Sequence, residues 1–134
     1  MINLIVHGYR LTQHAVRDRK IKARRSPKWP AIEKKVLEEH KGGCIACGSN
    51  DNLTVHHIIP FHIAPELELV ESNLAVFCMS KDRHCHLLVA HAGDFKGYSA
   101  SPISDASAIY IMYKTNDEPG VKKLLIMFSA GRKY

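Results

Sequence analysis

The sequence has no long apolar run. None of its 134 residues belongs to a stretch that approaches the roughly 20 consecutive apolar residues of a transmembrane helix. The first residues, MINLIVH, include neither a basic leader nor a small-residue cleavage site, so no secretory signal peptide is predicted. We therefore expect a cytoplasmic protein without a membrane partner.

Internal repeats and low-complexity segments are missing as well. Hydrophobic residues make up 46% of the chain, which is ordinary for a globular protein and argues against general disorder. A chain of 134 residues fits one domain with a core of its own.

Acidic residues are scarce in one part of the chain. Residues 10–35 contain ten lysines and arginines but only two acidic residues, a surplus of eight, whereas the whole chain has a net charge of +6. A concentrated cationic segment in a soluble chain indicates a polyanionic partner such as nucleic acid. The alternative is a solvated basic face or a flexible arm.

The four cysteines are Cys44, Cys47, Cys78 and Cys85. Two disulfides would be expected in a secreted chain, but the missing leader and the close Cys-x-x-Cys pair favour metal binding. Four thiolates close a tetrahedral structural zinc site, and four buried reduced thiols are the alternative. Six residues separate Cys78 from Cys85, which is wider than a usual pair, so His84 is an alternative ligand.

The central part of the chain has the pattern of two strands and a helix. Apolar residues at helical spacing predict a helix over residues 30–40, and Gly42 and Gly43 follow it as a stop signal. Short strands are predicted at residues 53–55 and 74–77, and a short helix at residues 85–91. This order is a ββα layout.

The C-terminal part predicts two more helices. Apolar spacing places one at residues 103–113, with Ser104 as its N-cap, and one at residues 121–128. The β-branched and aromatic residues keep a hairpin as the alternative. The predicted organisation is a basic arm (residues 1–28), a compact core (29–98) and a helical extension (99–134).

The adjacent histidines His56 and His57 are the most informative feature. Consecutive side chains of a strand point to opposite faces, so one ring can face a metal ion while the other faces an attacking water. His86 directly follows Cys85, so a metal site at the cysteines would also position His86. Each histidine alone is more often an ordinary surface or core residue.

The motifs Cys44–Gly48, Val55–Pro60, Ser72–Leu74 and Cys85–His86, taken in this order, resemble the HNH endonuclease family. The resemblance covers roughly residues 44–91, and the lead-in Ser26–Pro30 is similar to that of phage and bacterial members. It implies an α+β fold, in which a small ββα-metal core with a structural zinc knuckle is flanked by helices. It also implies a bacterial host cell as the setting.

The resemblance assigns roles to individual residues. His56 and His86 would bind the catalytic cation, His57 would be the general base, and Asn73 would brace the loop that carries the base or ligate the metal. His91 is a weaker candidate ligand, because helical ligand pairs prefer a separation of four residues rather than five.

Two further features of this region have simpler interpretations. His62 is interpreted as a loop histidine, with substrate contact as the alternative. Glu66 and Glu68 alternate with leucines, which predicts a half-buried strand or turn with solvated carboxylates.

The implied reaction is metal-dependent hydrolysis of DNA phosphodiester bonds. Imidazole ligands allow nickel, cobalt, manganese or zinc as the catalytic cation, and magnesium is allowed with water completing its coordination. The arm would bind phosphates without reading sequence. Its predicted DNA contacts are Arg17, Arg19, Lys20, Lys22, Arg24, Arg25 and Lys28.

Three other functions stay open at this point. A zinc-finger DNA-binding module would need the cysteines and the arm but not His56, His57 and Asn73. A protein-interaction module that uses zinc only for folding would not need the concentrated charge, and an RNA-cutting relative would look the same. Other phage or host DNA-processing proteins are conceivable partners, in DNA packaging, restriction or element mobility.

Overall fold

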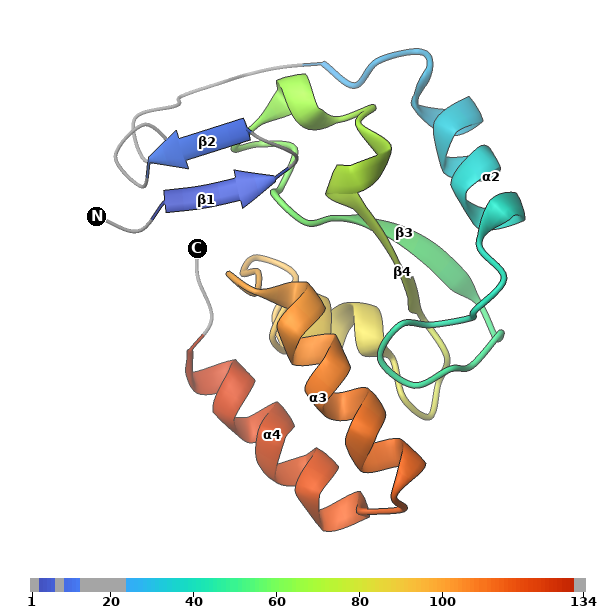
Figure 1. The fold of residues 1–134 in the computed structure, drawn as a ribbon, viewed down its shortest axis with the longest axis vertical. Helices are drawn as coiled ribbons and strands as arrows, with labels where there is room; N and C mark the ends of the chain where they lie inside the picture. The colour runs from blue at the N-terminus through green and yellow to red at the C-terminus, as the bar shows by residue number, and fades with distance from the viewer. Residues whose placement is uncertain (1–2, 7–8, 13–23, 132–134) are drawn as a thin grey trace.

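The computed structural model describes residues 24–131, together with the backbone of two short strands, β1 (Asn3–Val6) and β2 (Tyr9–Thr12). These strands pair antiparallel, with Asn3 opposite Thr12. Figure 1 shows the chain from the strands through α2 and the β3–β4 hairpin to α3 and α4.

Helix α2 (Trp29–Glu39) lies one residue from its predicted bounds and confirms the prediction. Proline stands in its first turn, where its missing N–H loses no hydrogen bond. His40 already has an extended backbone, which ends the helix. None of the helix residues is fully buried, so α2 rests on the surface of the core.

A tight turn follows at residues 43–49. The Cys44 N–H donates to Ser49 O at 2.8 Å, and the Gly48 N–H donates to Cys44 O at 2.7 Å. Gly43 has a φ of +71°, and a Cβ there would lie 2.7 Å from Gly48 O. Only glycine fits such a close approach in the left-handed region, so this residue type is what allows the turn to close.

Strands β3 (Leu53–His57) and β4 (Leu74–Cys78) form the antiparallel hairpin of the core. They confirm the two strands predicted at residues 53–55 and 74–77. Leu53 lies opposite Cys78, and His57 lies opposite Leu74. The paired histidines are therefore at one end of the hairpin and Cys78 is at the other. The long connection contains two short 3-10 turns, Pro65–Leu67 and Glu71–Asn73.

The predicted helix after Cys85 is a π-helix, His86–Ala90. Its hydrogen bonds include one from the His91 N–H to His86 O at 3.1 Å, five residues back. π-turns are rare and are frequently found at functional sites.

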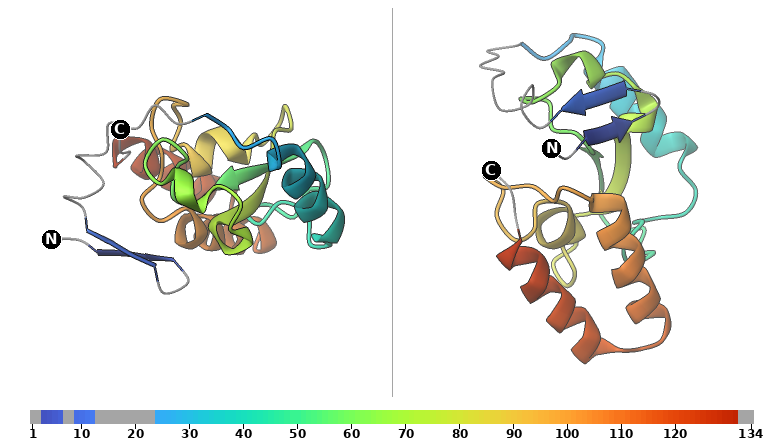
Figure 2. Two further views of the ribbon diagram at one scale, coloured as in Figure 1. Left: turned by 90° about the horizontal axis from the view of Figure 1, so that it is seen from above. Right: turned by 60° about the vertical axis from the view of Figure 1, so that its left-hand side comes forward.

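The C-terminal helices are α3 (Pro102–Lys114) and α4 (Glu118–Ala130), which excludes the alternative hairpin. Ser104 lies inside α3 rather than capping it, because the helix begins two residues earlier at Pro102. Asp117 caps α4 by accepting from the Gly120 N–H at 2.9 Å. The two helices run antiparallel, with the π-helix beside them (Figure 2).

One hydrophobic cluster joins the cysteine turn, β4, the π-helix, α3 and α4. Phe77 is fully buried at its centre, and Val89, Ile109 and Val121 contribute from the three helices. A smaller cluster around Leu67 lies under the β3–β4 connection. The fold is the predicted α+β arrangement of a ββα core flanked by helices. Among the residues described, no helix combines the length and apolar character needed to cross a membrane.

Candidate metal centres and active site

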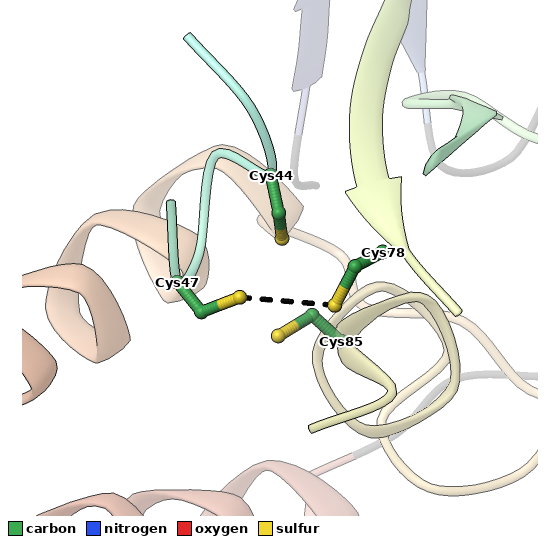
Figure 3. A group of neighbouring side chains, drawn as sticks. All are labelled: Cys44, Cys47, Cys78 and Cys85. Carbon is green, nitrogen blue, oxygen red and sulfur yellow. Dashed lines mark hydrogen bonds between the residues drawn. The ribbon is translucent and has the colours of Figure 1, made fainter. Parts of the chain in front are cut away.

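The four cysteines meet at one point of the core. Cys44 and Cys47 come from the tight turn, Cys78 ends β4, and Cys85 precedes the π-helix. Their sulfur atoms all lie within 4.8 Å of one another, and all four residues are buried (Figure 3). His84 is not part of this group, since its ring Nδ1 accepts from the Leu87 N–H instead.

The spacing of these thiols fits a tetrahedral metal site rather than a disulfide. Cys47 Sγ and Cys78 Sγ are 3.7 Å apart. Zinc–sulfur bonds of about 2.3 Å in a tetrahedron place sulfur atoms about 3.8 Å apart, whereas a disulfide bond is about 2.05 Å long. All four thiols are free. Four soft ligands in a closed, buried group are the donor set of a structural metal site.

The thiols of the cluster lie close enough to shift one another's pKa values. A hydrogen bond with the Cys44 thiol lowers the pKa of Cys47 well below its usual value, and the same bond raises the pKa of Cys44 to about 11. Contacts with these two sulfurs and burial raise the pKa of Cys85. Arg83 donates to Cys47 O at 3.2 Å and lies 4.2 Å over the Tyr113 ring. Its positive charge offsets the negative charge of a four-thiolate site.

Three histidines form a second cluster. The His56 ring is 5.3 Å from that of His86 and 5.0 Å from that of His91, and the latter two are 4.8 Å apart. Each offers one nitrogen, and these nitrogens lie within 4.8 Å of one another. His56 belongs to β3, whereas His86 begins the π-helix and His91 directly follows it.

The nitrogens of this cluster are arranged as metal ligands. His56 Nε2 and His86 Nδ1 are buried and have no hydrogen-bond partner in the described part of the chain. His91 uses Nδ1 to donate to Gly97 O at 2.8 Å, which leaves Nε2 as its free acceptor. Metal-bound histidines commonly donate their other ring N–H to a carbonyl in this way. Buried nitrogens that lack partners are costly unless a cation binds them, so the cluster fits a divalent ion.

The π-helix explains why His91 joins the cluster. In an α-helix, two residues that are five positions apart do not lie on the same face, and this is why the sequence predicts His91 as a weaker ligand. A π-turn closes its hydrogen bond over five residues, so it stacks residue 91 above residue 86. In this π-helix the separation of five residues therefore brings His91 to the same side as His86.

All three rings favour the neutral form. Burial, and then the neighbouring His91, lowers the pKa of His86 to about 4. Burial also lowers the pKa of His56 well below 6.5, with the neighbouring histidines acting in the same direction. The pKa of His91 is lowered mainly by burial. Neutral imidazole is the form that binds metal ions, so the cluster needs no deprotonation at neutral pH.

His57 has different partners from His56. Its Nε2 lies 3.0 Å from Glu68 O, and its ring is 4.5 Å from that of Trp29. A carbonyl oxygen can only accept, so Nε2 carries the proton and Nδ1 has the free lone pair when the ring is neutral. Burial lowers the pKa of His57, against the effect of its bond to Glu68 O. The ring is therefore an unprotonated acceptor at neutral pH.

Asn73 is fully buried and braces the segment after β3. Its Oδ1 accepts from the Ile59 N–H at 2.8 Å, and its Nδ2 donates to Ile59 O at 3.1 Å. Nδ2 also donates to Leu67 O at 3.4 Å. These bonds tie the residues after His57 to the long connection, so the amide acts as a brace.

The family model for HNH endonucleases matches residues 44–89. Residues 44–89 form an HNH endonuclease domain. The match contains all four cysteines together with His56, His57, Asn73 and His86, whereas His91 lies just beyond it. Comparisons with curated proteins and with solved structures find no match. The HNH family supports a nuclease function in general and implies a DNA substrate and divalent metals.

Asn73 gives a first prediction for the HNH domain. Asn73→Ala should lower the free energy of unfolding by about 2–5 kcal/mol, because it leaves the buried N–H and C=O of Ile59 without partners. Urea denaturation monitored by circular dichroism measures this change. The matched control is Asn50→Ala, since Asn50 is exposed. Equal effects of the two substitutions would contradict the bracing role.

Glu68 is buried, contrary to the prediction from its sequence pattern. Its carboxylate was expected to be solvated, but the residue is only 4% exposed. Oε1 pairs with Arg25 Nη1 at 3.3 Å, and Oε2 accepts from the Ser26 N–H at 3.0 Å. Alternation with leucines suggested one exposed face, and no sequence pattern revealed partners more than 40 residues away. Glu66, in contrast, is exposed as expected.

A pocket of about 370 Å³ brings the two groups of histidines together. His56, His86 and His91 line it along with His57, and exposed His62 lies at its edge with its ring 6.1 Å from that of Tyr98. Arg25, Phe61, Phe95 and Lys96 also line the pocket. The cationic and aromatic side chains Lys96 and Phe95, both exposed, were not singled out from the sequence, because single exposed residues carry no periodic signal.

The structure describes only part of the basic arm. Arg24, Arg25 and Lys28 are exposed, and Arg25 lies 5.0 Å from the centre of the Trp29 ring and 4.7 Å from that of Phe61. The other predicted DNA contacts, Arg17, Arg19, Lys20 and Lys22, lie outside the described residues.

Proposed function

We propose that this protein is a metal-dependent endonuclease that hydrolyses DNA phosphodiester bonds, with His57 as its general base. The observation that carries the proposal is the pocket shared by His57 and the three-histidine cluster. Two of the cluster nitrogens are buried without partners, which is the arrangement of an open ligand set. A DNA-binding zinc module has no need for such a group.

The reaction needs a base, a cation and a positioned phosphate. A divalent cation bound by His56, His86 and His91 would supply the positive charge that stabilises the scissile phosphate and the departing 3′-oxygen. His57 accepts the proton of the attacking water at Nδ1, since Nε2 is held by Glu68 O. Asn73 keeps the segment after His57 in place and does not act as a ligand, because its amide is already engaged.

The four-cysteine site would hold structural zinc in this proposal. Thiolates select zinc, and the sulfur spacing fits its tetrahedral bonds. Cys85 and His86 are adjacent, so the structural ion would fix the start of the helix that carries the catalytic ligands. Residues 29–98 would then be the nuclease core, and residues 99–134 an extension that packs on the zinc site.

The basic arm, residues 1–28, would bind the DNA backbone. Its predicted contacts place several positive charges on the segment that leads to the pocket, and Arg25 itself lines the pocket. Contacts of this kind position DNA without reading its sequence and weaken as the salt concentration rises. RNA offers the same phosphates, so a matched RNA substrate belongs in every cleavage assay.

The decisive experiment is plasmid cleavage by the purified protein with EDTA or with added magnesium, manganese, nickel or zinc. We expect metal-dependent nicking or linearisation, and we expect His86→Ala to slow it by about 10³-fold, because loss of the cation removes several kcal/mol of charge stabilisation. Glu38→Ala is the control, since Glu38 is exposed on α2 and lies outside the pocket. DNA binding without cleavage under any metal would instead favour the zinc-finger module.

A further inference from the structure

The segment from Arg25 to Trp29, which we name the strap, is bound beside the active site by a buried carboxylate, that of Glu68. Both oxygens of Glu68 are used: Oε1 pairs with Arg25 at 3.3 Å, and Oε2 accepts from the Ser26 N–H at 3.0 Å. The Glu68 side chain is 5% exposed, whereas that of Arg25 is 50% exposed. A buried carboxylate is stable only with such partners, so the strap and Glu68 depend on each other.

The same residue also holds the proposed base. Glu68 O accepts the hydrogen bond of His57 Nε2 at 3.0 Å, while the Trp29 ring packs on the imidazole at 4.5 Å with an angle of 34°. The backbone carbonyl of Glu68 therefore orients the His57 ring. The Glu68 side chain acts indirectly, because it binds the strap whose last residue, Trp29, covers that ring.

Other attachments of the strap are weak. Helix α2, which follows it, buries none of its residues completely. A second ion pair, Lys35 with Glu71, joins α2 to the core, but both side chains are 48% exposed. Exposed pairs contribute little to stability. The Arg25 guanidinium also lies 5.0 Å from the centre of the Trp29 ring and 4.7 Å from that of Phe61, so these contacts depend on the position that Glu68 gives to Arg25.

We propose that Glu68 is a positioning residue of the active site, which latches the strap over His57 and thereby fixes the orientation of its ring. The inference rests on the proposed function in assigning His57 the role of base. It also links the basic arm to the active site, because Arg25 belongs to the arm and lines the pocket. Glu68 touches neither the phosphate nor the water in this proposal and acts only through His57, Trp29 and Arg25.

Trp29 is the only tryptophan of the chain, so tryptophan fluorescence reports on the end of the strap where it covers His57. In the full-length, zinc-loaded protein we expect Glu68→Ala to raise acrylamide quenching of Trp29 several-fold, with circular dichroism and zinc content unchanged. Glu68→Gln keeps the size of the side chain but not its charge, and it should give an intermediate result. The matched control is Glu71→Gln, which removes the exposed ion pair of α2 and should leave quenching unchanged.

A second readout follows the base without relying on cleavage. Nitrogen NMR of the His57 ring should show one tautomer, with the proton on Nε2, in the wild type and in Glu71→Gln. A mixture of tautomers is expected in Glu68→Ala. In cleavage assays, Glu68→Ala should lower kcat by about tenfold or more with little change in KM, as loss of an orienting partner does.

The outcomes separate the two proposals. A Trp29 signal that stays shielded in both Glu68 variants would overturn the latch, and so would a released strap with an unchanged His57 tautomer and kcat. If Glu68→Ala fails to fold, Glu68→Gln and Arg25→Gln test the same bond from both sides. A wild type that cuts no nucleic acid, but in which Glu68→Ala frees Trp29 and mixes the tautomers, would support the latch and refute the nuclease.

Discussion

His57→Ala is expected to lower the rate of DNA cleavage by about 10²–10⁴-fold, which is the usual contribution of a general base. The substitution removes the imidazole whose Nε2 is held by Glu68 O and whose Nδ1 lone pair is free to accept a proton in the pocket. The three-histidine cluster is left intact, so metal binding and DNA affinity should change little. Single-turnover cleavage and a fluorescence-anisotropy titration of labelled DNA measure the two quantities separately.

Two further measurements test the assignment of the base. Added imidazole should partly restore cleavage by His57→Ala, because the lost ring leaves a space beside Trp29 that a free imidazole fits. In the wild type, cleavage should fall as the pH drops through the pKa of His57, which burial holds below 6.5. The rate should therefore be nearly constant around neutral pH. Cleavage by His57→Ala at the wild-type rate would refute the assignment.

The parts of this site that the sequence predicted depend on short-range patterns. The Cys-x-x-Cys spacing brings Cys44 and Cys47 close together within a tight turn, and the positive φ angles of Gly43 and Gly48 allow that turn here. The two strands and three of the helices were predictable from the spacing of apolar residues, because many of these residues pack into the core. The ββα order and the clustering of the four cysteines are therefore confirmed, because each follows from local geometry and from the soft chemistry of thiolates.

The parts that escaped prediction depend on long-range contacts or on an unusual helix. Residues 25 and 68 are distant in sequence, so no periodicity shows that Arg25 and Glu68 meet in a buried pair. The position of Trp29 on His57 is another contact of this type, because the two residues are far apart in sequence and share no local pattern. The inward position of His91 requires a π-turn, whose formation depends on how residues 86–90 pack against β3, β4 and the C-terminal helices.

Cys44→Ser should unfold the protein. Structural zinc in small domains contributes about 10–16 kcal/mol of apparent binding free energy, which is similar to or larger than the total stability of a typical domain. The four cysteines also lie in the same cluster as Phe77, Ile109 and Val121, so loss of the ion would loosen α3 and α4 along with the turn. Circular dichroism melts and zinc content by atomic absorption measure the effect, with the exposed Ser107→Ala as the control.

Loss of the proposed zinc site is expected to abolish metal binding by the histidine cluster as well, but not the reverse. Cys85 directly precedes His86, so Cys85→Ser should abolish both zinc retention and the binding of a second divalent ion, whereas His86→Ala should abolish only the latter. Titration of a zinc-loaded sample with cobalt or nickel, followed by absorption spectroscopy, separates the two ions. If the cysteines are instead buried reduced thiols, Cys44→Ser leaves the melting curve almost unchanged and the purified wild type contains no zinc. That result would mean that the hydrophobic cluster alone, without a metal ion, stabilises this region.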